Sequence, residues 1–254
     1  MSAYQFNLDT IANNLANTGT TAFKSSRANF EDSFYEYFKL PGAQDSSGKG
    51  TPIGIAVGTR VKVAGTELNF DQGGLIDTGQ PLDIAIEGDG FFQVTDSSEV
   101  LYTRNGAFSI NSEGEIVLAT ASKSWVLDPS ISIPADAMNI SISKDGVVEV
   151  QQPGVAEATQ LGQIQTAKFV NPQGLVQRGD SMYAESAASG SPQVGNPNIE
   201  GRGGVQQGRL EISNVNAVNE LVDLIKTQRY FELSSQAVQA ADQMLQQIAN
   251  LRRF

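Results

Sequence analysis

The sequence predicts an α+β fold in which coiled-coil-like helices at the N- and C-terminal ends, discontinuous in the chain, bracket a mainly antiparallel β domain. Three observations lead to this prediction. Apolar residues near both ends recur at spacings of three and four, which is typical of helices. Between the ends they alternate with polar residues, as in half-buried strands. Glycine-containing turn sequences separate several alternating runs and indicate hairpins, whose strands are antiparallel.

The first segment carries one apolar stripe. Its members are spaced four, three and four residues apart: Tyr4, Leu8, Ile11 and Leu15. Gly19 and the threonines after it end the pattern. From Met1 to Leu15 there are only about four helical turns, and the stripe begins abruptly. We therefore expect the native helix to extend further upstream.

The last segment predicts one long helix. No proline or glycine interrupts residues 214–253, and Ser213 or Asn214 stands where a helix N-cap is expected. Such a helix would be roughly 60 Å long. One row of its stripe repeats every seven residues: Leu224, Phe231, Val238 and Leu245. The complementary row consists of Thr227, Ser234, Ala241 and Ile248, and its small residues favour close packing against neighbouring helices. The simplest arrangement pairs the two terminal segments as an antiparallel or assembly-dependent bundle.

The middle of the chain predicts strands and hairpins. Turn sequences at residues 111–114 and 144–146 lie between alternating runs, and Asp-Gly in the second is a strong hairpin signal. Strands are expected over residues 81–88, 90–94, 102–110, 116–118, 139–143, 147–150 and 163–170. Residues 41–52 and 186–204, rich in Gly and Ser, resemble connectors. We expect four parts: a helical segment 1–40, an extended linker 41–72, a β domain 73–207 and a long C-terminal helix over 208–254.

Composition excludes several functions. The net charge is -11 and no basic cluster precedes the last residues, which disfavours nucleic acid and anionic membranes as partners. The chain has no cysteine and no histidine, so disulfides, thiolate metal sites and histidine catalysis are excluded. No apolar run is long enough to span a membrane. We expect protein partners and no cofactor, metal or catalytic residue.

Several weak motifs have simpler explanations. Gly88-Asp89-Gly90 is followed by a strand pattern and not by the helix that a phosphate loop requires, so a structural turn is expected. The aspartates between residues 71 and 96 lack the dense oxygen spacing of a calcium loop. Nothing marks out one carboxylate pair for glycoside hydrolysis.

Residues 8–17, Leu-Asp-Thr-Ile-Ala-Asn-Asn-Leu-Ala-Asn, resemble the N-terminal motif of flagellar rod and hook proteins, and Phe23-Lys24 continues it. Residues 79–92 and 102–108 are similar to the β-domain motifs of that family. Residues 213–229 resemble its C-terminal helix. The matches follow the family's order along almost the whole chain.

The resemblance implies a structural subunit of the flagellar basal body and not an enzyme. It implies export through the flagellar secretion apparatus and polymerisation through the terminal helices into a hollow rod in the periplasm, which transmits torque to the hook. The expected partners are further copies of the chain, the proximal rod and hook proteins and the surrounding ring proteins. Residues 40–44, after an aromatic-rich segment, resemble the distal-rod members. A proximal-rod or hook subunit is the alternative within the family.

The subunit interface implied by the resemblance lies on the terminal helices. Its expected residues are Leu8, Ile11, Asn14, Leu15, Asn17, Asn214, Leu221, Leu224, Ile225, Phe231, Val238, Leu245 and Ile248. Two positions depart from the family pattern. Ala22 replaces the usual glycine before Phe-Lys, and we expect Gly19 to relocate the turn. Tyr230 replaces a small residue and adds bulk beside Phe231.

Two functions of other classes remain open at this point. A secreted β-domain adhesin or scaffold would need a concave aromatic groove. A carbohydrate-active enzyme would need a close, buried carboxylate pair. Exposed apolar stripes at both termini would instead favour the structural subunit.

Overall fold

The computed structural model describes residues 2–42, 53–58, 60–96, 98–120, 123–154 and 157–251. The chain forms two compact units, each discontinuous in sequence. Unit 1 comprises Met1–Leu15, Ser26–Glu67 and Ala217–Phe254, and unit 2 comprises Ala16–Ser25 and Leu68–Asn216. The predicted α+β class, with terminal helices and a mostly antiparallel β part, is confirmed.

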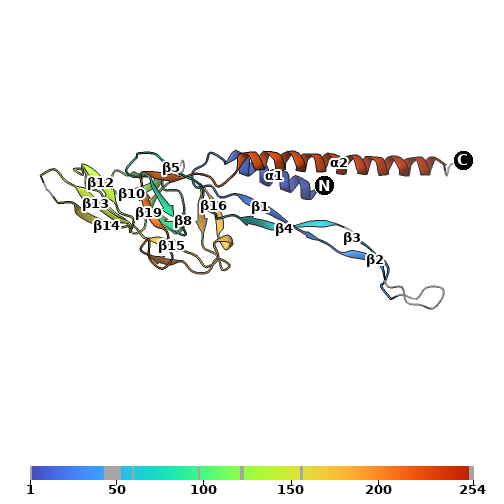
Figure 1. Cartoon of the computed structure of the whole chain (residues 1–254), viewed down its shortest axis with the longest axis horizontal. Coiled ribbons are helices and arrows are strands. Elements are labelled where there is room, and N and C mark those ends of the chain that lie inside the picture. The colour runs from blue at the N-terminus through green and yellow to red at the C-terminus, as the bar shows by residue number, and fades with distance from the viewer. Residues whose placement is uncertain are drawn as a thin grey trace. The chain divides into compact units, whose positions relative to one another are not determined.

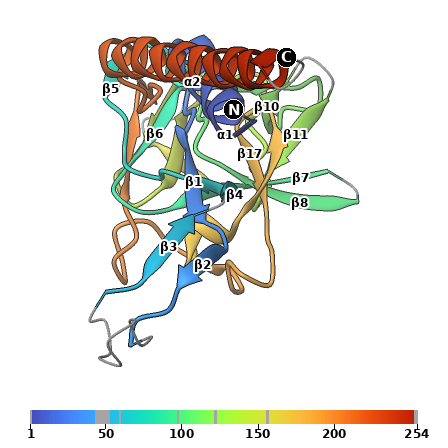
Figure 2. The same cartoon turned by 90° about the vertical axis from the view of Figure 1, so that its right-hand side faces the viewer.

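Unit 1 contains the two helices, α1 (Ser2–Ala16) and α2 (Ala217–Leu251), which lie side by side in Figures 1 and 2. With 35 residues, α2 extends about 50 Å at ~1.5 Å per residue. It begins at Ala217, three residues later than the predicted cap at Asn214. No helix in the described part of the chain is long and apolar enough to cross a membrane.

The rest of unit 1 is a set of strands that the sequence analysis missed. Strand β1 (Ser26–Asp32) pairs with β4 (Val61–Leu68), and β2 (Tyr35–Lys39) pairs antiparallel with β3 (Ile55–Gly58). The expectation of a helical segment 1–40 is therefore wrong beyond Ala16, and the expected linker 41–72 contains two strands. The reason is visible in residues 35–39 and 61–68, which are rich in aromatic and β-branched residues that favour strands. Residues 43–52 of the expected connector lie outside the described residues.

The largest sheet of unit 2 has nine strands, in the order β16-β17-β8-β7-β11-β10-β9, with β15 pairing both β7 and β18. These strands are β7 (Phe91–Asp96), β8 (Glu99–Thr103), β9 (Phe108–Ile110), β10 (Ile116–Ala119), β11 (Ser124–Leu127), β15 (Thr166–Lys168), β16 (Val176–Gly179), β17 (Met182–Ala184) and β18 (Gln193–Gly195). A short 3-10 helix, η1 (Pro172–Gly174), precedes β16.

Three smaller sheets lie in the described part of unit 2. β12 (Asn139–Ile142), β13 (Val147–Gln151) and β14 (Thr159–Gln163) form one of them. β19 (Gly204–Gln207) pairs with β6 (Ile84–Glu87), and β20 (Arg209–Glu211) pairs with β5 (Leu75–Asp77). In both pairs a strand within residues 204–211 bonds a strand within residues 75–87.

Both predicted hairpins are present. Ile110 faces Ile116 across the β9–β10 turn, and Ile142 faces Val148 across the β12–β13 turn. The single strand expected over residues 163–170 is wrong, because the chain there divides into β14 and β15. Between them the Ile164 N–H donates to Gly146 O at 2.8 Å, so this residue bonds a turn and not the neighbouring strand.

Two buried clusters form the core of unit 2. The larger cluster is aliphatic for the most part and includes Ile84, Phe92, Val94, Leu118 and Val148, none of them exposed. The smaller cluster is aromatic: the Phe91 ring meets the rings of Phe169 and Tyr183 edge-on. Edge-to-face packing of this kind is favourable for aromatic pairs.

Candidate functional site

The two helices of unit 1 meet along a single antiparallel register. Tyr4 lies against Tyr230, with ring centroids 6.2 Å apart. Three residues on, Asn7 Nδ2 donates to Thr227 Oγ1 at 3.2 Å. Seven residues further along α1, Asn14 Nδ2 donates to Glu220 Oε1 at 3.3 Å. Each step forward on α1 is matched by the same step backward on α2, so the two segments pair antiparallel within the chain, which is one of the two arrangements that were expected.

The predicted α1 residues lie in this contact to different degrees. Ile11 and Asn14 are buried, whereas Leu8 and Leu15 are half-buried. Asn14 has a second role within the unit: its Oδ1 accepts the Ser26 N–H at 3.0 Å and its Nδ2 donates to Ser26 O at 2.9 Å. The side chain therefore fixes the start of β1 beside α1.

The residues of the two predicted heptad rows of α2 become more exposed toward the end of the helix. Leu224 and Phe231 are half-buried, and Thr227 between them is buried. Further on, Val238, Leu245 and Ile248 are 50%, 63% and 61% exposed. We call this row, from Leu224 to Ile248, the first stripe. Its first half faces α1, and its second half presents apolar side chains to solvent.

The opposite side of α2 carries another apolar row, which we call the second stripe. At 3.6 residues per turn its members, nine, five and two residues before Thr227, lie roughly half a turn away from it. They are Val218, Val222 and Ile225, which are 69%, 45% and 56% exposed. The predicted residues Leu221 and Ile225 lie on or beside it and are also exposed. The sequence analysis named Leu221 and Ile225 only as residues of the implied subunit interface and placed them on no stripe, although the spacings of four and three from Val218 to Ile225 were a usable signal.

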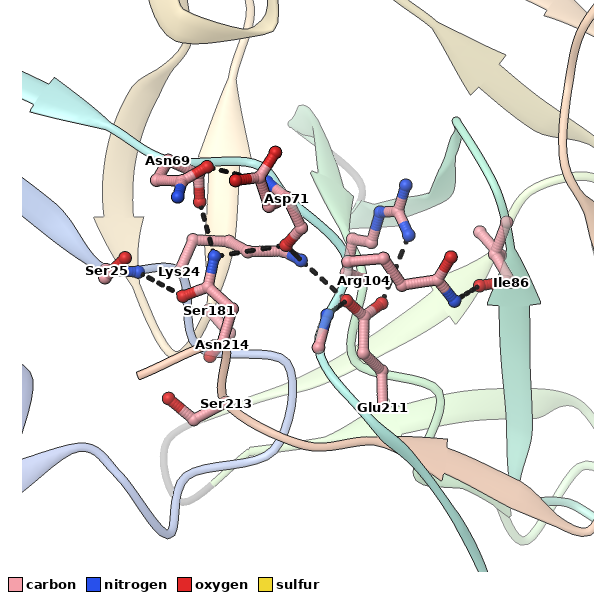
Figure 3. A network of polar contacts seen from close by, with 12 residues as sticks. Lys24, Ser25, Asn69, Asp71, Ile86, Arg104, Ser181, Glu211, Ser213 and Asn214 are labelled. Atoms are coloured by element: carbon pink, nitrogen blue, oxygen red, sulfur yellow. Dashed lines mark hydrogen bonds and ion pairs between the residues drawn. The ribbon is translucent and has the colours of Figure 1, made fainter. Parts of the chain in front are cut away.

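Unit 2 contains a buried ionic network that the sequence analysis did not assemble (Figure 3). Lys24 Nζ lies 2.6 Å from Glu211 Oε1, and Arg104 Nη1 lies 3.1 Å from Glu211 Oε2. The three side chains are 0%, 4% and 0% exposed. Lys24 and Arg104 belong to recognised motif segments, but no local pattern links either of them to Glu211.

Backbone groups complete the network. Lys24 Nζ donates to Asp71 O at 2.7 Å, and Arg104 Nη2 donates to Gly88 O at 2.6 Å. The Gly73 N–H donates to Glu211 Oε1 at 2.8 Å. Burial lowers the pKa of the Lys24 ammonium group; the Glu211 carboxylate opposes this shift and Arg104 adds to it. The network contains two cations and one carboxylate, so its stability depends on Glu211.

Two predicted interface residues lie in unit 2 and outside the helices. Asn17 follows α1, and its Oδ1 accepts from Thr20 Oγ1 at 3.1 Å. Asn214 precedes α2: its Oδ1 accepts the Ser25 N–H and its Nδ2 donates to Asn69 O, each at 2.8 Å. The predicted capping role of Asn214 is wrong, because its side chain instead ties three segments of unit 2 together.

The two departures from the family pattern have clear structural outcomes. Ala22 itself adopts φ 56°, so Gly19 does not relocate the turn. The Ala22 side chain is fully buried, and its N–H donates to Glu211 O at 2.8 Å. The ring of Tyr230 packs on Tyr4, so its bulk extends the contact between the helices.

The alternative sites find little support in the described residues. Glu211 is the one buried carboxylate there, and it pairs with cations and not with a second carboxylate. No group of three or more Asp or Glu side chains in that part of the chain is arranged to hold a metal ion. After Gly88 and Gly90, both at positive φ, strand β7 begins directly, so this is a structural turn.

Paired terminal helices with exposed apolar stripes, attached to a β unit closed by its own ends, define a structural subunit of an assembly. Comparison with known proteins agrees. A family model described as "Flagellar hook protein FlgE/F/G D1 domain" matches residues 85–150, and one described as "Flagellar basal body rod FlgEFG protein C-terminal" matches residues 206–251. The chain belongs to the flagellar basal-body rod protein family, and it is a structural rod subunit of the flagellar basal body.

Relatives that match along nearly their full length support this family assignment. The flagellar basal-body rod protein FlgG of Buchnera aphidicola subsp. Baizongia pistaciae is 40% identical over 252 residues, which are 99% of this chain and 96% of the relative. The FlgG proteins of Borreliella burgdorferi and Caulobacter vibrioides are 40% and 41% identical, covering 100% and 99% of this chain and 96% of each relative.

Proposed function

We propose that this chain is the distal-rod subunit, that it catalyses no reaction, and that it polymerises through α1 and α2 into a hollow helical shaft. The observation that carries the proposal is the pair of apolar stripes on opposite sides of α2. A helix in a monomeric core needs only one apolar face. A helix with a second apolar face has a side for its own chain and another for a neighbouring copy.

Exposed apolar area supports the same proposal. Burying such area contributes roughly 25 cal/mol per Å². The second half of the first stripe (Val238, Leu245 and Ile248) and the whole second stripe lie at 45% exposure or more. A head-to-tail contact that uses both stripes does not close on itself in a dimer, and such contacts generate helical tubes.

The remaining parts of the proposal follow from the family. The chain leaves the cytoplasm through the flagellar export apparatus and assembles in the periplasmic part of the basal body. Its neighbours along the axis are the proximal rod and the hook, and ring proteins surround it. The four-part division into residues 1–40, 41–72, 73–207 and 208–254 also stays a prediction, although the helical extent of the first part has been corrected above.

A charge placed on the first stripe tests polymerisation. Leu245→Asp should abolish rods in basal bodies purified from cells that carry only this variant, because an unpaired buried charge is costly in every copy. Gln246→Asp is the matched control: it adds the same charge one position further on, on a polar face, and should leave rods of normal length. Both variants should unfold like the parent when followed by the fluorescence of Trp125, the single tryptophan, which is buried in unit 2. Normal rods with Leu245→Asp would overturn the proposal.

An inserted epitope tests where the subunit lies along the flagellar axis. An epitope placed in the exposed β12–β13 turn at Asp145 should be found between the proximal rod and the hook in imaged basal bodies. A label confined to the proximal half would favour the proximal-rod alternative.

A further inference from the structure

The first piece of unit 2, Ala16–Ser25, contacts the last piece of the same unit and also Asn69, Asp71 and Ser181. We call these pieces the N segment and the C segment, the latter comprising residues 208–216. The Ala22 N–H donates to Glu211 O, and the Ser25 N–H donates to Asn214 Oδ1, each at 2.8 Å. The Asn214 N–H in turn donates to Phe23 O at 3.3 Å. Figure 3 shows Ser25 and Lys24 facing Asn214 and the Asp71 backbone.

The C segment has further partners in the β domain. Strand β20 pairs with β5, with Leu210 opposite Ile76. The Ile212 N–H donates to Gly74 O at 2.9 Å, and Arg104 reaches Glu211 Oε2 at 3.1 Å. None of these contacts involves the N segment. The C segment can therefore dock on the β domain when the N segment is absent from it.

Because of these charges, docking of the N segment depends on the C segment, whereas docking of the C segment does not depend on the N segment. With the C segment in place, Arg104 and Glu211 form a buried pair of zero net charge. Lys24 then adds its ammonium group to a carboxylate that is already present. Without Glu211, the N segment would bury the Lys24 cation near Arg104 with no counter-ion, which is strongly unfavourable.

We propose that unit 2 closes in a fixed order: the C segment docks first, and the N segment docks only on a C segment that already presents Glu211. Charge sets this order and loop length does not, since Lys24 lies 47 positions from Asp71 whereas Gly73, which donates to Glu211, lies 138 positions from it. The segment that follows α1 thus stays free until the end of the β unit is present. This inference concerns the folding of the chain and does not depend on the proposed polymerisation.

Hydrogen–deuterium exchange of the full-length chain, read by mass spectrometry, tests the order. In Glu211→Gln, peptides that contain Ala22 and Ser25 should exchange at least about tenfold faster than in the parent, because breaking a buried ion pair is strongly destabilising. Lys24→Met removes the cation and leaves the Arg104–Glu211 pair, so those peptides should stay protected. The double variant Lys24→Met with Glu211→Gln should regain protection.

Ala22→Pro tests the independence of the C segment. Proline removes the Ala22 N–H and cannot adopt positive φ, so the N segment should undock and exchange freely. Peptides that contain Ile212 should keep their protection within about twofold, because the β20–β5 pairing does not involve the N segment. Equal loss of protection in both segments would show mutual docking and overturn the order.

Two further outcomes decide the charge argument. Unchanged protection of Ala22 and Ser25 in Glu211→Gln overturns it. If Glu211→Gln unfolds unit 2 altogether, as seen from Trp125 fluorescence, Ala22→Pro decides instead: a free N segment with Ile212 still protected supports the order, and equal loss of protection in both segments contradicts it.

Discussion

The Lys24 ammonium group lies 2.6 Å from the Glu211 carboxylate, and neither side chain has any exposure to solvent, although 187 positions separate the two residues. A buried ion pair of this kind contributes little compared with well-packed apolar residues, but it is costly to break. Arg104 shares the same carboxylate. Loss of Glu211 should therefore leave both buried cations without a counter-ion.

Glu211→Gln should lower the free energy of unfolding of unit 2 by about 3–5 kcal/mol, because it leaves two buried cations without a counter-ion. Asp77→Asn is the control, since Asp77 lies in the neighbouring strand and forms an exposed pair with Arg209. That change should cost no more than about 1 kcal/mol. Urea unfolding followed by Trp125 fluorescence measures both. Similar losses in the two variants would contradict the central role of Glu211.

Ala22→Val should destabilise unit 2 by about 2 kcal/mol or more, because a β-branched residue is strongly disfavoured at φ 56° and the side chain is fully buried. Ala22→Gly should be close to neutral. It relieves roughly 1–2 kcal/mol of left-handed strain but gives up a buried methyl group, about 0.8 kcal/mol, and frees the unfolded chain. Urea midpoints of the two variants give the comparison. A valine variant as stable as the parent would refute the strained turn.

Gly106→Ala should destabilise unit 2 by at least about 2 kcal/mol through overpacking. A Cβ atom at Gly106 would lie 1.6 Å from Ile84 O, and the Gly106 carbonyl accepts the Ile84 N–H at 3.0 Å. Gly19→Ala is the control within the same unit, because a Cβ there meets no atom within 4 Å. It should change stability by less than about 1 kcal/mol. Thermal unfolding of both proteins gives the comparison. An unchanged melting temperature in Gly106→Ala would contradict the close approach of Gly106 to Ile84.

The contact between α1 and α2 should strengthen as the pH falls from neutral toward 4.5. Burial raises the pKa of Glu220 above its ordinary value of 4.5, the hydrogen bond from Asn14 opposes the shift, and Asp223 adds to it. A raised pKa means that the folded state holds the proton more tightly. Its contribution is thus complete below 4.5 and is lost as the pH rises through the shifted pKa.

Glu220→Gln should remove this dependence and keep the acceptor for Asn14. Far-ultraviolet circular dichroism follows the helices of unit 1 during thermal unfolding at a series of pH values. A parent protein whose helices melt independently of pH across this range would contradict the shift.

The sequence by itself determined the class of the fold and the pattern of its helices. Heptad spacing from Tyr4 to Leu15 and from Leu224 to Leu245 predicted two helices, whose pairing was expected to be antiparallel or assembly-dependent. The contacts of Tyr4 and Asn14 show the antiparallel arrangement. Alternation and Asp-Gly chemistry predicted the hairpins. These signals are local, since helix period, strand period and turn geometry are properties of a few consecutive residues. The motifs at both ends and in the middle indicated the family.

Only the tertiary structure decided which distant residues share a site. The positive φ of Ala22 and the second stripe of α2 depend on what surrounds each residue, and the pairing of Lys24 and Arg104 with Glu211 joins three segments that no local pattern links. The strands within residues 26–39 and 55–68 were missed although residues 35–39 and 61–68 are rich in strand-favouring residues; which of these strands pair is again decided by the fold. Charge pairing across 187 positions is set by chain closure and burial, and these are properties of the folded unit and not of any short stretch of sequence.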